Sequence, residues 1–198
     1  MQNVSKFIGA AVALALGVGS AHAQSPKVEC AAPEALCKQL TDYVVANIKP
    51  WLSEAAIVNS INTQNAASAK MTNVDIDKAD VAWTKRSDKN LIDSKMNNEL
   101  STFLRTKKDG GNGVIFEIFV FDNKGLNVGE TDLTQDYNQG DEAKYWKTFG
   151  VGPDAIFVDK VGKDGGRNIS QASLAIKDPE TGAAIGAVTV GIDVDKLK

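Results

Sequence analysis

Apolar residues in the first part of the chain recur at helical spacing. Leu36, Leu40, Val44 and Ile48 follow one another at intervals of four residues. Side chains at that spacing lie on one face of an α-helix. The pattern predicts a long N-terminal helix, which Pro50 kinks or breaks because proline has no backbone donor.

The helical pattern resumes twice further along the chain. The apolar stripe of Trp51–Ile61 continues the first helix, and the polar stretch 62–81 is expected to extend it briefly and then to form a loop. Ser87 or Asp88 can cap a second helix, because a short polar side chain there accepts from a free backbone N–H. The apolar positions of this second helix are Leu91, Ile92, Met96, Leu100, Phe103 and Leu104.

Short apolar runs separated by turn residues occupy the second half and predict β-strands. The first run is apolar on both faces, as expected of a strand in the middle of a sheet. Strict alternation places Ile118 and Val120 on one face and Ile115, Phe119 and Phe121 on the other. Glycine-containing turns join the last three runs, which predicts an antiparallel meander and an α+β fold. The runs are Val114–Phe121, Leu126–Glu130, Ala155–Val161, Arg167–Ile176 and Ile185–Asp193.

Glu117 is the one charged residue within the first of these strands. A buried carboxylate without a partner is costly, so it either changes its pKa or pairs with a neighbour. Two interpretations are open: a glutamate that reaches water at the end or edge of the strand, or a residue of a ligand pocket. We include Glu117 among the candidate ligand-binding residues.

A polar, aromatic insert, 131–153, separates the second and third strands. One face of the last strand is small and partly polar, which leaves room for a concavity beside Phe119 and Phe121 of the central strand. Ligand sites are mainly apolar clefts with a few polar groups. The alternative is that the aromatic side chains of the insert fill the concavity. The candidate ligand residues around it are Tyr137, Tyr145, Trp146, Lys147, Arg167, Ser173 and Phe119.

Residues 1–23 have the pattern of a cleavable signal peptide. Lys6 precedes an apolar core, 7–18, and the small residues of 21–23 form a cleavage site. A retained membrane anchor is the alternative, but a span needs about 20 apolar residues. We therefore expect 24–198 to form a single exported domain, without a membrane span, in the periplasm.

Composition excludes several classes of function. The chain carries a formal net charge of −3, which gives no basic footprint for nucleic acid. The only histidine, His22, lies in the predicted leader. We therefore expect no Ser-His-Asp or Cys-His catalysis, no histidine-ligated zinc and no attached haem. No cofactor and no metal are expected.

The two cysteines, Cys30 and Cys37, lie seven residues apart. In an oxidising compartment an even pair is most simply a disulfide, whereas a redox or metal pair would need other spacing and more ligands. Two turns apart in one helix, their α-carbons would be about 10 Å from each other, too far to bridge. Pro33, at a helix's first turn, lets Cys30 stay extended and fold back.

Three parts of the sequence resemble the extracytoplasmic PAS-like sensor domains called Cache or PDC. The resemblance extends over about 88–197, and the long helix before it fits the family's N-terminal helix. The first part, Phe121–Gly125, matches the family's first hairpin. The second, Asp136-Tyr137 with Tyr145-Trp146, resembles the aromatic insert. The third is similar to the last hairpin and consists of Asp178, Gly182, Gly186 and Asp193.

The resemblance implies a five-stranded antiparallel sheet packed on a long N-terminal helix, with the second helix packed on it. It also implies a small-molecule pocket between the other face of the sheet and the insert. The family's amino-acid-recognition pattern has an arginine just before the insert's tryptophan, where Lys144 and Tyr145 stand here. We therefore expect a small organic acid or a similar metabolite. The pocket residues carried over are Tyr137, Tyr145, Trp146, Lys147, Arg167, Ser173 and Asp193.

Family members usually continue from the last strand into a transmembrane helix, whereas this sequence ends at Lys198. We therefore expect a free periplasmic sensor module, not an enzyme, that acts through a membrane receptor or sensor kinase. A homodimer formed through the long helix is a further expectation.

Two alternatives are open. The chain could be a pure interaction or dimerisation domain with a filled pocket, or a hydrolase that pairs Asp136 with Asp141 or Glu142. A calcium site at Asp132 and these acids lacks the required loop spacing.

Overall fold

Helices dominate the first half of the chain and strands the second in the computed structural model, which describes residues 26–197. The predicted signal peptide, 1–23, lies outside the described residues. The helices are α1 (Glu34–Asn47), the 3-10 turn η1 (Lys49–Trp51), α2 (Ala55–Ser68), α3 (Asn73–Thr84), α4 (Lys89–Met96), α5 (Glu99–Gly110) and α6 (Ala143–Trp146). The strands are β1 (Lys27–Cys30), β2 (Ile115–Asp122), β3 (Asn127–Glu130), β4 (Ala155–Val158), β5 (Gly162–Asp164), β6 (Arg167–Lys177) and β7 (Ala184–Asp193).

The strands form one seven-stranded sheet in the order β1-β4-β6-β7-β2-β3, with β5 paired to β6. The five predicted strands are present as β2, β3, β4, β6 and β7, and all of them pair antiparallel. The prediction of a purely antiparallel five-stranded sheet was nevertheless wrong. β1 adds a parallel strand to β4, and the short β5 adds another pairing to β6. Both added strands are short and largely exposed, so neither shows as an apolar run.

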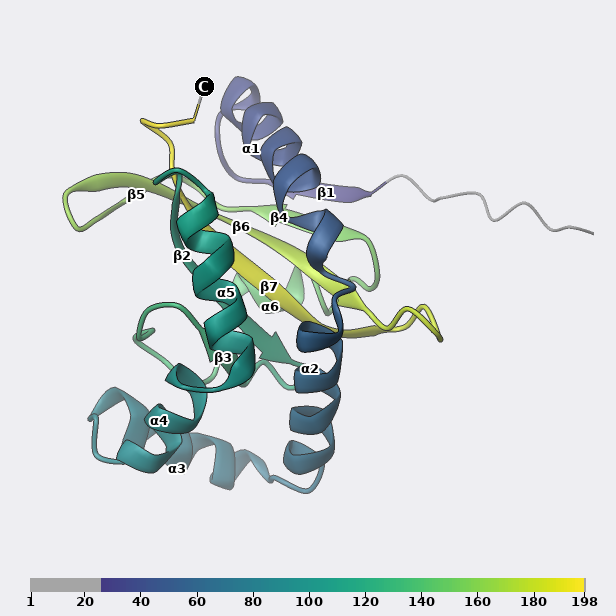
Figure 1. Ribbon diagram of the computed structural model, residues 1–198, viewed down its shortest axis with the longest axis vertical. Helices are drawn as coiled ribbons and strands as arrows, with labels where there is room; N and C mark the ends of the chain where they lie inside the picture. The colour runs from purple at the N-terminus through teal and green to yellow at the C-terminus, as the bar shows by residue number, and fades with distance from the viewer. Residues whose placement is uncertain (1–25, 198) are drawn as a thin grey trace, which may run out of the picture.

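Helices α1, α2 and α5 cover one face of the sheet, and α6 lies behind the opposite face (Figure 1). Strand alternation turns every second side chain of β7 toward the helices, as the sequence predicted. Burying a large aliphatic side chain contributes about 1.5–3 kcal/mol, so this interface is the main source of stability. Its buried members include Leu40, Val44, Leu100, Leu104, Ile118, Val120, Val188, Val190 and Ile192.

Pro50 separates the first helical stripe into two helices. α1 ends at Asn47, and Pro50 lies in the turn η1 before α2 begins. Trp51 is buried there, and its Nε1 donates to the carbonyl of Asn47 at 2.7 Å. The break predicted at Pro50 is therefore confirmed.

The remaining helices differ from the prediction in two places. The end of 62–81 was expected to be a loop but forms α3, which begins with a capping box between Thr72 and Asp75. The second predicted helix is divided into α4 and α5. Asn98 caps α5, since its side chain accepts from the Ser101 N–H at 2.8 Å. A polar cap inside an apolar stripe starts a new helix.

A β-bulge between Ile115 and Glu117 changes the faces of β2. Strict alternation placed Ile115 with Phe119, but Ile115 packs in the helix-side core with Ile118. That placement was wrong because a bulge inserts one residue and shifts the alternation that precedes it. Phe119 and Phe121 lie on the opposite face, as predicted.

Cys30, at the end of β1, forms a disulfide with Cys37 of α1. Their α-carbons are 6.2 Å apart, within the range that a disulfide spans. Pro33 stands at the N-terminal boundary of α1, so Cys30 lies in the extended segment before the helix. The predicted disulfide is confirmed.

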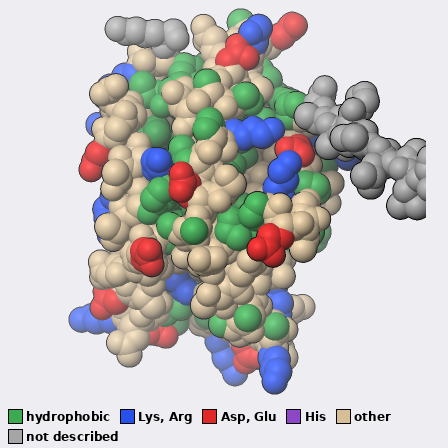
Figure 2. Space-filling view, turned by 45° about the vertical axis from the view of Figure 1, so that its right-hand side comes forward, with side chains coloured by type: hydrophobic (Ala, Val, Ile, Leu, Met, Phe, Trp, Pro, Cys, Tyr) green, Lys and Arg blue, Asp and Glu red, His purple; other side chains and the backbone are tan. Residues whose placement is uncertain are grey.

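The surface has no strong bias of charge on the face seen in Figure 2, where basic and acidic side chains are interspersed. None of the helices within 26–197 is long and apolar enough to cross a bilayer.

Candidate functional site

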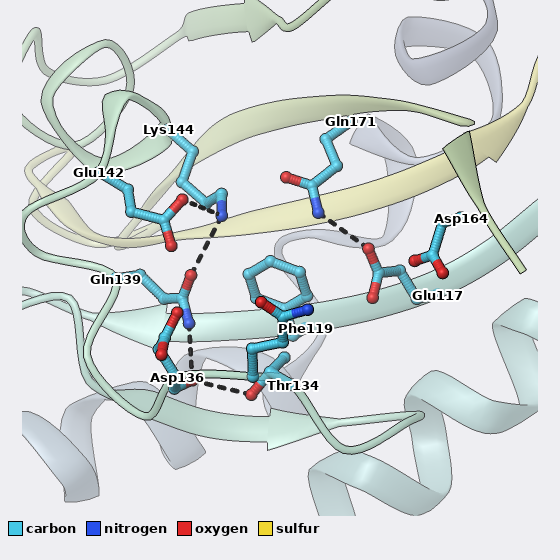
Figure 3. Close-up of a pocket in the computed structure, with 10 residues that line it drawn as sticks. Glu117, Phe119, Thr134, Asp136, Gln139, Glu142, Lys144, Asp164 and Gln171 are labelled. Atoms are coloured by element: carbon cyan, nitrogen blue, oxygen red, sulfur yellow. Dashed lines mark hydrogen bonds and ion pairs between the residues drawn. The ribbon is translucent and has the colours of Figure 1, made fainter. Parts of the chain in front are cut away.

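A cavity of about 300 Å³ lies between the insert and the sheet face opposite α1, α2 and α5 (Figure 3). Its volume is at the lower end of the range of ligand pockets, about 300–1,000 Å³, and therefore suits a small molecule. Strands β2 and β6 supply the floor, and the insert supplies the opposite wall. The lining residues are Glu117, Phe119, Thr134, Gln135, Asp136, Gln139, Glu142, Lys144, Asp164 and Gln171.

Strand register explains one end of the cavity. Glu117 of β2 and Gln171 of β6 are both paired with Gly191 of β7, so the three residues form one row across the sheet. A β-carbon at Gly191 would lie 2.7 Å from Glu117 Cγ. The missing side chain therefore leaves room for Gln171 Nε2 to donate to Glu117 Oε1 at 2.9 Å.

Burial raises the pKa of the Glu117 carboxyl, because removal from water disfavours the charged form. The hydrogen bond from Gln171 and the positive charge of Lys144 oppose that effect. The negative charges of Asp164 and Asp132 reinforce it. Glu117 is thus a pocket residue with one amide partner.

Lys144 forms the other end of the cavity. The residue is only 8% exposed, and its Nζ lies 5.4 Å from the centroid of the Phe119 ring. Nζ donates to Glu142 Oε2 at 2.6 Å and to Gln139 Oε1 at 3.1 Å. Gln139 Nε2 in turn donates to the carbonyl of Asp136 at 2.8 Å. This chain of contacts fixes the lysine within the insert, where Figure 3 shows it facing the cavity.

Helix α3 holds the wall that contains 134–138. Trp83 is completely buried, and its Nε1 donates to the Thr134 carbonyl at 3.0 Å. Asp80 Oδ1 accepts from the backbone N–H groups of Tyr137 and Asn138 at 2.8 and 2.9 Å. A helix that the sequence pattern did not reveal therefore positions one side of the site.

Glu130 lies behind this wall. It is paired with Phe119 in the β2–β3 register, so both side chains project from the same face of the sheet. Thr134 Oγ1 donates to Glu130 Oε2 at 2.9 Å, while Glu130 Oε1 and Asn127 Oδ1 have no hydrogen-bond partner among the described residues. Burial raises the pKa of Glu130 to about 7, although the hydrogen bonds with Thr134 act to lower it.

Only Glu117 and Phe119 of the candidate ligand residues line this cavity. Tyr145 and Trp146 line a wider depression of about 740 Å³ between the insert and α3, and Trp146 is 60% exposed there. Tyr137 is buried against Trp83, and its hydroxyl accepts from Gln64 at 3.1 Å.

The other candidates lie elsewhere. Lys147 pairs with Glu29 of β1 at 2.7 Å and lies 4.5 Å from the centroid of the Phe157 ring. Ser173 is completely buried and shares a hydrogen bond of 2.9 Å with Thr189. Arg167 Nη1 is 3.9 Å from Asp193 Oδ2, beside a separate shallow depression that Arg167 lines. The structure therefore does not bring the nine candidates into one site.

Sequence reasoning missed most of the polar lining. Gln171 could have been found, since alternation on β6 places it two residues before Ser173 on the same face. Lys144 lies close to the position where the family's amino-acid-recognition pattern has an arginine. Its place in the sequence did not show that its side chain faces the cavity. The residues contributed by loops, such as Asp136 and Gln139, carried no periodic signal.

The arrangement has the fold of a solved sensor domain, with a pocket between the sheet and the insert. The sensor domain of E. coli DcuS matches 83% of this chain and 96% of its own length, with a TM-score of 0.51 and 10% identity. The fold-level resemblance predicted from the sequence is confirmed.

Two further solved structures are similar. The sensor domain of the V. cholerae histidine kinase DctB matches with 10% identity and a TM-score of 0.42, over 81% of this chain and 54% of that one. The isoleucine-bound sensory domain of the C. jejuni chemoreceptor Tlp3 matches with 15% identity and a TM-score of 0.40, over 83% and 65%. The sequence matches no family model and no curated protein.

Proposed function

We propose that this chain is a sensor module that binds a small molecule in the cavity above Phe119. The observation that carries the proposal is the cavity itself, which holds the buried ammonium group of Lys144 and the half-buried carboxyl group of Glu117. Burying charged groups is costly, and such groups cluster where proteins bind or react with ligands. The sensor-domain fold supports the same function.

The sensor-type fold and the Cys30–Cys37 disulfide support a location outside the cytoplasm. We propose the periplasm in particular, on the basis of the predicted signal peptide, 1–23. We also propose that a membrane receptor or sensor kinase reads the ligand state of the domain. A co-purification of the tagged protein with solubilised membranes, in the presence and absence of ligand, tests this partnership.

A thermal-shift screen against a metabolite collection tests small-molecule binding. A ligand at 100 times its dissociation constant stabilises the folded state by about 2.7 kcal/mol, which raises Tm by several degrees in a domain of this size. We expect Gln171→Trp, which fills the cavity, to abolish the shift. Trp146→Ala, in the outer depression, should preserve it. A shift lost only in Trp146→Ala would move the site outside the cavity.

One observation favours a second function, that of an interaction domain. Trp146 is 60% exposed, and exposed aromatic side chains are common in protein interfaces. If this function holds, the wild-type protein dimerises or captures a partner and Trp146→Ala does not. Light scattering after size-exclusion chromatography measures the dimer directly. The hydrolase alternative gains no support, since Glu142 is ion-paired with Lys144 at 2.6 Å.

A further inference from the structure

Carboxylates outnumber cations along the wall of the cavity. Its charged lining residues are Glu117, Asp136, Glu142, Asp164 and Lys144. The lysine is neutralised, because its Nζ lies 2.6 Å from Glu142 Oε2. Glu117, Asp136 and Asp164 form no ion pair with any residue of 26–197. The lining residues therefore carry more acidic groups than unpaired basic ones.

The carboxylates affect one another. Burial raises the pKa of Asp136, and the charges of Asp80, Glu142 and Asp141 raise it further, against the effect of Lys144. The negative charge of Asp164 likewise raises the pKa of Glu117. An incoming carboxylate would add another like charge to this group, whereas an incoming cation would relieve the repulsion. The small organic acid expected from the sequence is thus the less favourable ligand.

The geometry separates two acidic ends. Figure 3 shows Glu117 and Asp164 on one side of the Phe119 ring, with Asp136 and the Lys144–Glu142 pair on the other. The face of an aromatic ring attracts cations, and the ammonium of Lys144 already lies near this ring. A linear molecule that crosses the ring could place one positive group at each end.

A second, independent observation lies at the wall of the cavity. Glu130 is completely buried, projects from the same face as Phe119, and is separated from the cavity by Thr134. Its Oε1 has no hydrogen-bond partner within the described part of the chain. Burial raises the pKa of Glu130 to about 7, so this carboxyl ionises near neutral pH, and its charge then adds to the negative potential behind the wall.

We infer that the cavity binds a small organic cation with ammonium groups, and that a linear diamine fits its two acidic ends. This inference rests on the proposed function, because it assigns a ligand class to the same cavity. Each ammonium would donate hydrogen bonds to carboxylate oxygens, and the methylene chain would pack on Phe119. Lys144 holds the wall together through Gln139 and Glu142 rather than contacting the ligand as an anion receptor.

Isothermal titration calorimetry with two probes of equal length tests the ligand class. 1,4-Diaminobutane and succinate both carry charged groups at the ends of a short chain, but of opposite sign. We expect the diamine to bind and succinate not to bind. Glu117→Gln should weaken diamine binding about tenfold or more, since it removes the negative charge that strengthens the hydrogen bond to the ammonium.

Two further variants distinguish a specific effect on the cavity from a general effect of lost negative charge. Asp164→Asn, on the exposed β5, should also weaken diamine binding and provides a second variant should Glu117→Gln fail to fold. Glu180→Gln removes one exposed carboxylate from the β6–β7 turn and should leave binding unchanged. Equal loss in all three variants would indicate nonspecific attraction and would overturn the inference.

Three further outcomes would contradict either the ligand class or the proposed function. Succinate binding that Lys144→Gln abolishes would overturn the ligand class while it supports the proposed function. A different metabolite whose thermal shift is lost in Gln171→Trp, with no response to the diamine, would do the same. If no compound in the screen shifts Tm, the proposed function itself fails.

Discussion

The side chain of Glu130 is completely buried on β3. Thr134 and Asn127 donate to one of its carboxylate oxygens, and the other has no hydrogen-bond partner within 26–197. Its pKa is raised from 4.5 to about 7, mainly by burial. The folded protein therefore holds a proton that the unfolded chain releases near pH 4.5. The stability contributed by the neutral carboxyl is present in full below pH 4.5 and is lost as the pH rises to about 7.

We expect Glu130→Gln to remove this dependence. The shift of the Glu130 pKa corresponds to about 3 kcal/mol, which the wild-type protein loses between pH 4.5 and 7. The glutamine stays neutral, so the variant should gain up to that amount over wild type at pH 8 and little at pH 4.5. Urea unfolding at both pH values measures the difference, with Glu180→Gln as the exposed control. A variant that keeps the wild-type pH dependence would contradict the assignment.

The sequence predicted individual site residues only where strand alternation fixed their face. Glu117 and Phe119 were found because both lie on a central strand that is apolar apart from one carboxylate. Tyr137 was placed in the pocket because it belongs to the insert, yet it packs against Trp83. Nothing in a loop's sequence shows which face of the fold it turns to, since loops have no period.

Among the elements, the long apolar runs were predictable and the short polar ones were not. β2, β4, β6 and β7 follow from alternating or continuous apolar residues. β1 and β5 are exposed and are strands only because neighbouring strands offer backbone partners. α3 has few buried residues and depends on its capping box and on contacts with the insert. Tertiary contacts of this kind leave no period in the sequence.

The contact between α3 and the insert can be tested at Asp80. Its carboxylate accepts from two backbone N–H groups, those of Tyr137 and Asn138. Asp80→Ala leaves both donors without this acceptor, so we expect a loss of about 1–3 kcal/mol in unfolding free energy. Hydrogen exchange at these two amides should become faster. Asp77→Ala, at an exposed position of the same helix, should change neither quantity.

Over the whole molecule, the two faces of the sheet have different roles. The face toward α1, α2 and α5 carries the large aliphatic core, and the opposite face carries the charged cavity. Changes in the cavity therefore need not weaken the main core, and stability and ligand binding can be measured separately. The α+β class and this division were predictable, because strand alternation distinguishes the two faces.

The disulfide constrains the chain at the edge of the whole sheet. Replacing both Cys30 and Cys37 by serine frees a short loop in the unfolded state, and loop-closure entropy predicts a loss of about 2–3 kcal/mol. Urea unfolding of the wild type and of the double variant measures the loss. A reducing agent should destabilise the wild type to the same extent and leave the double variant unchanged. Equal sensitivity of both proteins would refute the expectation.

The pairing of β1 with β4 also bears on solubility. β4 is the buried, apolar segment Ala155–Val158, and without β1 its outer backbone groups would form an open edge on which a second molecule could add a strand. β1 occupies that edge and presents Lys27 and Glu29 outward, charged residues that discourage further addition. The disulfide keeps β1 in place. We therefore expect oxidation of the two cysteines to protect the protein from edge-to-edge aggregation, so that reduced samples scatter more light on storage.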